Sequence, residues 1–301
     1  MQLRWLVLLG LLAGAAPVQA YCLLTTEMPM PGDRCASTGV PLAWERQCLS
    51  YSLMQREQTQ PAFERIRDVT DLSFSTWMGV RCGARPIGLD VGQTQAMSEC
   101  DDPEYNVSNP NANSILFVED WSDRELPDDA FGLTLVWHNP DSGRIYDADM
   151  QINETLGTLA ICGAICPGNT VDLQNVVTHE AGHFFGLGHS NVTTATMSAR
   201  ARVGEVSKRD LAADDRDGLC AIYGELPAAT CSEVDFMPDN GFSAQCWGGD
   251  RGAMTRRTDC SAAGPGALRS SAPGVLALLL AAAALALGRR STLVRSRRRF
   301  L

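Results

Sequence analysis

Apolar residues recur every three or four positions in three stretches of the chain, which is the spacing of a helix with one buried face. Thr170 or Asp172 would cap the second of these helices, and Gly224 would end the third. The predicted helices cover residues 61–80, 172–187 and 212–223.

Shorter apolar stretches before and between the first two helices predict strands. The last two of them are joined by residues 139–143, which include a proline and a glycine and therefore predict a turn. The predicted strands cover residues 44–53, 86–91, 114–118, 133–137 and 144–152.

The first twenty residues have the pattern of a secretory signal peptide, residues 1–20. Arg4 precedes an apolar stretch over residues 5–12, and the small residue Ala20 offers a cleavage site. A retained membrane anchor is the alternative, but the apolar stretch is too short to span a bilayer comfortably. We expect an exported protein whose mature chain starts with an N-terminal extension over residues 21–39.

A second apolar stretch, over residues 272–288, carries no charged side chain and is just long enough for a membrane helix. The arginines that follow favour a cytoplasmic place for that end and an exterior place for the main domain. A buried core helix is the alternative, but it would not need apolar residues on every face. The arginines are Arg289, Arg290, Arg295, Arg297, Arg298 and Arg299.

The charges of the chain are distributed unevenly. The net charge is −10, but the signal and residues 261–301 together hold eight of the 25 basic residues and none of the 35 acidic ones. The exported part therefore carries a charge of about −18. Such a surface repels nucleic acid, so no nucleic-acid partner is expected, and it suits an extracellular protein.

Eleven cysteines in an exported chain predict disulfide bonds. Ten of them form five bridges in this interpretation, and Cys260, just upstream of the C-terminal apolar stretch, is left over. Spacing alone leaves the pairing open. We favour Cys231 with Cys246, around a turn-forming segment, and Cys82 with Cys100.

Four residues within eleven positions have the chemistry of a catalytic metal site. On a helix, His179 and His183 lie one turn apart on the same face, and Glu180 lies beside them. Gly186 would end the helix in a left-handed turn that brings His189 to the same ion. Three imidazoles leave the fourth tetrahedral position of a zinc ion open to water, as in catalytic and not structural sites.

This arrangement predicts hydrolysis of peptide bonds. Zinc lowers the pKa of its bound water and polarises the scissile carbonyl group. Glu180 would take the proton of that water as general base and pass it to the leaving amine as general acid. Because the neutral imidazole binds the metal, acid is expected to release zinc and inactivate the enzyme.

The segment from His179 to His189 resembles the zinc motif of the metzincin peptidases, which is followed by a methionine turn. Met197 stands where the matrixin branch has that methionine, beneath the zinc ligands, and a plain core methionine is the alternative. Ser190 and residues 211–224 are also similar to matrixins.

The resemblance implies an α/β (α+β) catalytic domain over residues 40–225, with a twisted mixed sheet, an antiparallel edge strand and three main helices. It implies one catalytic zinc and a protein or peptide substrate that lies extended along the edge strand, for which residues 133–137 are the best candidate. We expect a monomer. Residues 226–265 would form a Cys-containing appendage or stalk, and residues 266–301 a membrane segment with an arginine-rich tail.

Three features need comparison with the vertebrate matrixin pattern. Those enzymes use further histidines for a second, structural zinc, but only His138 remains here, and we interpret it as a surface or turn residue. Asp147 and Asp149 offer hard oxygen ligands for calcium, and a simply solvated pair is the alternative. The triplet around Cys82 resembles the inhibitory cysteine of matrixin propeptides, but its place after the first predicted helix favours a disulfide.

The C-terminal segment resembles the myxobacterial sorting tail, which is built from a cysteine, an apolar helix and an arginine cluster. Asp259 stands before Cys260, where that tail usually has glycine. The resemblance implies a transient membrane contact through the helix and an enzyme that ends at the cell surface near Cys260. A eukaryotic lipid-anchor signal is the alternative, but such signals normally end with apolar residues.

Two functions of different kinds fit these residues. One is an active zinc endopeptidase that is anchored at, or released from, the cell surface. The other is a catalytically silent protein that keeps the fold to bind proteins or glycans. Binding needs no general base, so the presence of Glu180 favours the active enzyme.

Overall fold

The computed structural model describes residues 20–29, 35–36, 38–56, 61–94, 96–246 and 256–263. Its main sheet has 7 strands in the order β11-β7-β8-β6-β2-β5, with β1 paired to β8. The pairs β8–β6, β6–β2 and β2–β5 are parallel, whereas β7 is antiparallel to β8. The strands are β1 (Ala43–Trp44), β2 (Cys48–Leu53), β5 (Asp90–Gln93), β6 (Ser114–Val118), β7 (Ala130–His138), β8 (Arg144–Asn153) and β11 (Arg256–Ala263).

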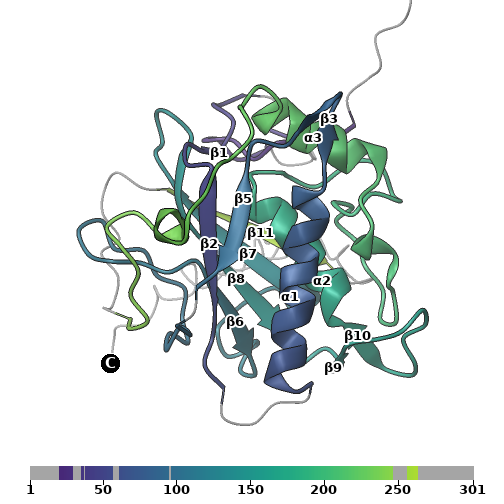
Figure 1. Ribbon diagram of the computed structural model, residues 1–301. Helices are drawn as coiled ribbons and strands as arrows, with labels where there is room; N and C mark the ends of the chain where they lie inside the picture. Colours follow the sequence, from purple (N-terminus) through teal and green to yellow (C-terminus); the bar gives the residue numbers. More distant parts are fainter. Residues whose placement is uncertain are drawn as a thin grey trace, which may run out of the picture. The chain divides into compact units, whose positions relative to one another are not determined.

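Three α-helices accompany the sheet: α1 (Phe63–Met78), α2 (Leu173–Phe184) and α3 (Ala213–Tyr223). Helices α1 and α2 lie together over one face of the sheet (Figure 1). The cap of α2 is Asp172, whose carboxylate accepts the backbone N–H of Asn175. The mixed sheet and the three helices confirm the predicted fold class.

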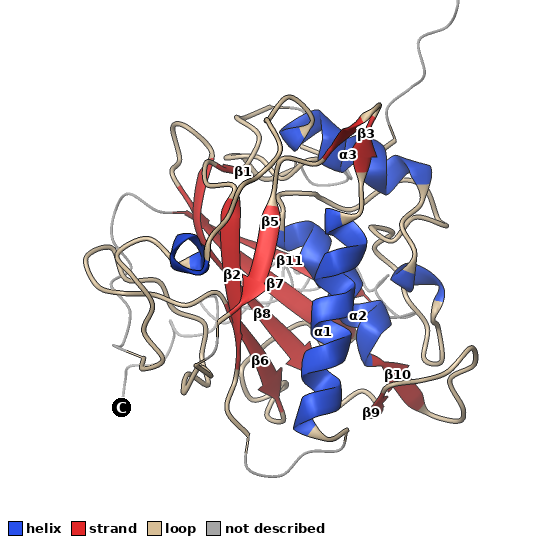
Figure 2. Cartoon of the chain, viewed as in Figure 1, coloured by secondary structure: helices blue, strands red, loops and turns tan. Residues whose placement is uncertain are grey.

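Short elements connect these parts (Figure 2). Strand β3 pairs antiparallel with β4 in a small hairpin after α1, and β9 pairs parallel with β10 just before α2. Neither pair was predicted, because two or three residues carry no readable alternation of apolar and polar positions. These elements are β3 (Arg81–Cys82), β4 (Arg85–Pro86), β9 (Thr158–Ala160), β10 (Thr170–Asp172) and the 3-10 helices η1 (Ser207–Arg209) and η2 (Glu233–Phe236).

The strand that we predicted over residues 44–53 is two strands with different partners. Strand β1 pairs with β8, and β2 pairs with β5 and β6, so the chain changes neighbours across its polar residues 45–47. The strand predicted over residues 86–91 is also interrupted, since β4 ends at Pro86 and β5 begins at Asp90. In both places the hydrogen-bonded pairing changes within one predicted strand.

Aromatic side chains hold the two helices on the sheet. The ring of Tyr51 on β2 stacks on that of Phe74 on α1, with centroids 4.6 Å apart, and Phe74 meets Phe184 of α2 edge to face. The indole N–H of Trp77 on α1 donates to the carbonyl of Thr178 on α2, at 2.9 Å. Burying each of these rings contributes roughly 2–3 kcal/mol, which stabilises helix α2 against α1 and the sheet.

Five disulfide bonds connect ten of the cysteines. Our two favoured pairs are wrong, because the partners come together only in the folded chain, up to 183 residues apart. The expectation that Cys82 is disulfide-bonded is confirmed. Two of the bonds attach the segment after Glu225 to the sheet region. The pairs are Cys22–Cys35, Cys48–Cys231, Cys82–Cys220, Cys100–Cys246 and Cys162–Cys166.

The predicted edge strand, residues 133–137, lies inside β7 but is not outermost in the described sheet. Strand β11 pairs with β7 in antiparallel register, with Thr258 opposite Val136 and Ala262 opposite Gly132. Within the described residues, no helix is both long and apolar enough to cross a bilayer. Residues 1–19 of the predicted signal and the predicted membrane helix at residues 272–288 lie outside the described ranges.

Candidate metal centre

Helix α2 carries His179, Glu180 and His183, and all three side chains are fully buried. The helix ends at Phe184, and the chain then turns through Gly186, whose φ is +90°. A Cβ atom at Gly186 would lie 2.3 Å from the carbonyl oxygen of Leu42. Glycine is therefore required here both by the backbone conformation and by the close approach of a neighbouring segment.

The turn brings three imidazoles together. The Nε2 atoms of His183 and His189 are 3.2 Å apart, and one ring nitrogen of each of the three histidines lies within 4.8 Å of the others. Two nitrogen ligands of one tetrahedral zinc ion are separated by roughly 3.3 Å. The Nε2 atom of His179 is buried and has no hydrogen-bond partner among the described residues, so the three side chains fit a shared metal ion.

Backbone carbonyls set the orientation of two of these rings. Nδ1 of His179 lies 2.6 Å from the carbonyl of Thr196, and Nδ1 of His183 lies 2.8 Å from that of Leu187. A ring that donates from Nδ1 keeps its Nε2 lone pair for a metal. Burial, and then neighbouring positive charge, hold the pKa of both histidines well below its ordinary value, which keeps the rings neutral.

Glu180 lies against β7. The hydroxyl group of Thr134 donates to one oxygen of the Glu180 carboxylate at 2.7 Å. A Cβ atom at Gly132 would lie 2.7 Å from the other oxygen, so a larger residue there would collide with it. The sequence did not point to Thr134 or Gly132, because nothing in the spacing indicates which strand residues face the helix.

Met197 packs directly beneath helix α2. Its side chain is 2% exposed, and a Cβ atom at Gly182 would lie only 2.1 Å from its sulfur. The backbone N–H groups of Thr196 and Met197 both donate to the carboxylate of Asp215 on α3, at 2.8 and 2.9 Å. Sequence reasoning missed Asp215, although the similarity of residues 211–224 to matrixins covered it.

The structure corrects two interpretations of residues on β7 and β8. His138 is 1% exposed and belongs to β7, so it is not a surface or turn residue. Asp147 and Asp149 on β8 are buried as well, so they are not a solvated pair. The segment before β6 covers the two aspartates: Tyr105 stacks on Tyr146, and the backbone N–H of Glu104 donates to Asp149.

The two aspartates differ in their hydrogen bonds. Asp149 accepts the backbone N–H groups of Glu104 and Ser114, at 2.9 and 2.6 Å. Neither carboxylate oxygen of Asp147 has a hydrogen-bond partner in the described part of the chain. Burial and then nearby carboxylates raise the pKa of Asp147 well above its ordinary value. Calcium at these residues stays a prediction.

A pocket of about 720 Å³ opens beside the methionine turn. The segment after Met197 provides nearly all of its lining, including two arginines and one glutamate. The lining residues are Thr193, Ser198, Arg200, Ala201, Arg202, Val203, Gly204, Glu205 and Ser207.

Comparison with known proteins agrees with this geometry. The family model described as Matrixin matches residues 43–224. The chain belongs to the matrixin family. This membership confirms the resemblance to matrixins seen in the sequence, and the family implies a zinc metalloendopeptidase domain with zinc as its catalytic cofactor.

Relatives from plants and animals share this matrixin region. Metalloendoproteinase 1-MMP of Arabidopsis thaliana is 48% identical over 189 residues, which are 61% of this chain and 45% of the relative. Matrix metalloproteinase-25 of Homo sapiens is 28% identical over 192 residues, 61% of this chain and 30% of the relative. The matched region thus spans less than half the length of these relatives.

Proposed function

We propose that this protein is an exported zinc endopeptidase that cleaves proteins or peptides, with His179, His183 and His189 as the ligands of one zinc ion. The convergence of three imidazole nitrogens beside a buried glutamate carries this proposal. A catalytically silent binding protein would need neither the glutamate nor its fixed orientation.

Zinc bound by these residues would lower the pKa of a water molecule and polarise the scissile carbonyl group. Glu180 would accept a proton from that water and deliver it to the leaving amine. The hydrogen bond from Thr134 holds one carboxylate oxygen in place, which orients the group for proton transfer. Met197, packed under α2, would support the histidines from below.

The test is cleavage of casein or gelatin by the purified exported chain. We expect Glu180→Gln to retain one zinc per chain while kcat/KM falls by roughly 10²–10⁴-fold. Loss of zinc to a chelator should abolish cleavage, and added zinc should restore it. Cleavage that survives both Glu180→Ala and the chelator would rule out this mechanism. Absence of cleavage by the zinc-loaded wild-type protein would favour the silent binding protein.

We further propose that substrate lies along β7 and has to take the place of β11. Strand β11 is antiparallel to β7, and its Ala262 is opposite Gly132, the residue that packs on Glu180. A chain that lacks residues 256–301 should therefore show a KM for peptides roughly tenfold lower, because an attached competitor has a high effective concentration. Equal KM values for the two chains would contradict this proposal.

The protein would act outside the cell membrane, at the cell surface or released from it. The signal-like start of the chain, the apolar stretch at residues 272–288 and the arginines behind it support this location. Labelling of the protein on intact cells by a membrane-impermeant reagent tests it, and labelling only after lysis would contradict it.

A further inference from the structure

Lys208, in η1, is a buried lysine next to a proposed zinc ligand. Its side chain is 2% exposed. The ammonium group donates to the carbonyl oxygens of Thr196, at 3.1 Å, and Ser198. Its nitrogen also lies 3.3 Å from Nδ1 of His179. Lysine is almost never fully buried unless its charge is compensated, so this arrangement calls for an explanation.

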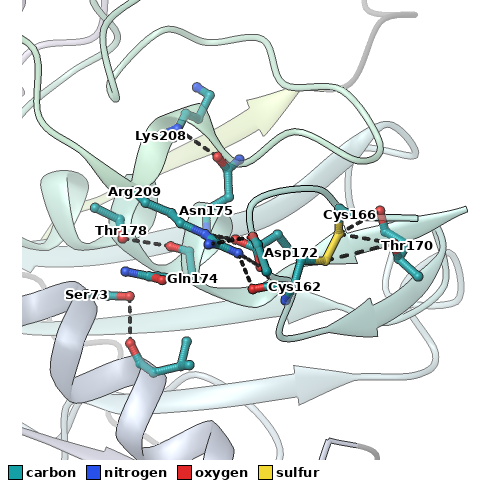
Figure 3. A network of polar contacts seen from close by, with 12 residues as sticks. Ser73, Cys162, Cys166, Thr170, Asp172, Gln174, Asn175, Thr178, Lys208 and Arg209 are labelled. Carbon is teal, nitrogen blue, oxygen red and sulfur yellow. Dashed lines mark hydrogen bonds and ion pairs between the residues drawn. A yellow bond between two sulfur atoms is a disulfide. The ribbon is translucent and has the colours of Figure 1, made fainter. Parts of the chain in front are cut away.

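The position of Lys208 is fixed by helix α2. The backbone N–H of Lys208 donates to the side-chain oxygen of Asn175 at 2.8 Å, and Arg209 forms an ion pair with Asp172, the cap of the helix. Figure 3 shows both contacts and the Lys208 side chain extending away from Asn175. The same helix carries His179, so the backbone of Lys208 and the imidazole are both attached to α2.

The carbonyl of Thr196 is shared between the two side chains. It lies 2.6 Å from Nδ1 of His179 and accepts a hydrogen bond from Lys208 as well. If His179 binds zinc through Nε2, its Nδ1 keeps the proton, and the ammonium group faces an N–H and not a lone pair. A carboxylate behind a histidine ligand raises the basicity of the ring, and a cation has the opposite effect.

We propose that Lys208 is a positioning residue whose positive charge, acting through His179, weakens electron donation to the zinc ion. A zinc ion held by the three histidines would then bind less tightly and would lower the pKa of its water further. The carboxylates of Glu205, Glu180 and Asp215, on neighbouring segments, favour the charged form of the lysine. This inference rests on the proposed zinc site, and it assigns Lys208 a part in tuning that site.

The experiment compares the wild-type chain with Lys208→Met, Lys208→Gln and Lys208→Arg. Competition with a chromophoric chelator gives the zinc dissociation constant, and kcat/KM against pH gives the acid limb of activity. We expect the two uncharged variants to bind zinc roughly tenfold more tightly and to move the acid limb up by about half a pH unit. Lys208→Arg keeps the charge and should stay close to wild type.

Two results would overturn the inference. In the first, the uncharged variants have the zinc dissociation constant and the acid limb of wild type. In the second, they bind zinc more weakly and their acid limb does not move. The second result would mean that Lys208 only packs the turn. Thermal unfolding identifies a variant that fails to fold, and Lys208→Gln, which can still donate to the carbonyls, then decides. Zinc binding that is unchanged in the His183→Ala variant would instead refute the proposed zinc site itself.

Discussion

One carboxylate, that of Asp215, is buried next to the metal centre, and another, that of Asp147, is buried on β8. The two differ in the hydrogen bonds that they accept. Asp215 accepts three backbone N–H groups, those of Thr196, Met197 and Ala212. Asp147 has no hydrogen-bond partner among the described residues. Burial raises the pKa of both groups, but only at Asp215 do backbone hydrogen bonds oppose that rise. A buried carboxylate keeps its charge where the backbone provides donors, and it favours a proton or a cation where none is provided.

The two regions should therefore respond to pH in opposite directions. The pKa values of His179 and His183 are lowered, so the unfolded chain binds protons that the folded chain does not, and their contribution to stability is lost as pH falls below about 6.5. The pKa of Asp147 is raised, so its contribution is present at low pH and is lost as pH rises above 3.8.

The largest effect is expected from Asp215→Ala, which removes the acceptor of three backbone N–H groups in or near the buried turn. Each buried donor left without a partner costs about 1–3 kcal/mol, so the free energy of unfolding should fall by roughly 3 kcal/mol or more. Urea denaturation measures the loss. Asp217→Ala, at an exposed position of the same helix, is the matched control and should change stability little. Equal losses in the two variants would show that the hydrogen bonds to Asp215 contribute nothing specific.

A smaller loss is expected from Gly182→Ala. The added methyl group would lie 2.1 Å from the sulfur of Met197 and 2.9 Å from the ring of Trp77. Overpacking of this kind costs about 1–3 kcal/mol, and it should also weaken zinc binding because Met197 supports the histidines. Gly163→Ala, where no atom lies within 4 Å, serves as the control. Met197→Ala removes the sulfur that the new methyl group would meet, so the losses of stability from Gly182→Ala and Met197→Ala should be less than additive. Fully additive losses would argue against contact between these two residues.

Asp147→Asn is expected to change the free energy of unfolding least at neutral pH. Its effect on the pH dependence of stability distinguishes the region around Asp147 from the metal centre. Wild type should lose up to about 1.4 kcal/mol of unfolding free energy per pH unit between pH 3.8 and the raised pKa of Asp147. The asparagine variant should lack that dependence, which thermal unfolding at several pH values measures. Identical slopes would contradict burial of an unpaired carboxylate. A stabilisation by calcium that the variant lacks would instead support the calcium prediction at Asp147 and Asp149.

The helices and the zinc motif could be predicted from the sequence because their signals are local. His179, His183 and Gly186 are related by helix geometry and by the φ that glycine allows, and neither depends on distant parts of the chain. The longer strands were predicted correctly. The prediction of one strand over residues 44–53 was wrong, because β1 and β2 lie on either side of polar residues 45–47 and pair with different strands. The three predicted helices are confirmed, because the spacing of apolar residues along a helix is a local property of the sequence.

The sequence by itself determined the family, the helices and the side chains that converge on a metal. Only the tertiary structure decided which cysteines pair, that Thr134 and Asp215 support the site, that Lys208 lies behind His179, and that β11 lies along β7. It also showed that His138, which we interpreted as a surface or turn residue, and Asp147, for which a solvated position was the alternative, are both buried. The reason is physical: helix periodicity is fixed within one turn, whereas contacts between elements depend on long-range packing that no local pattern encodes.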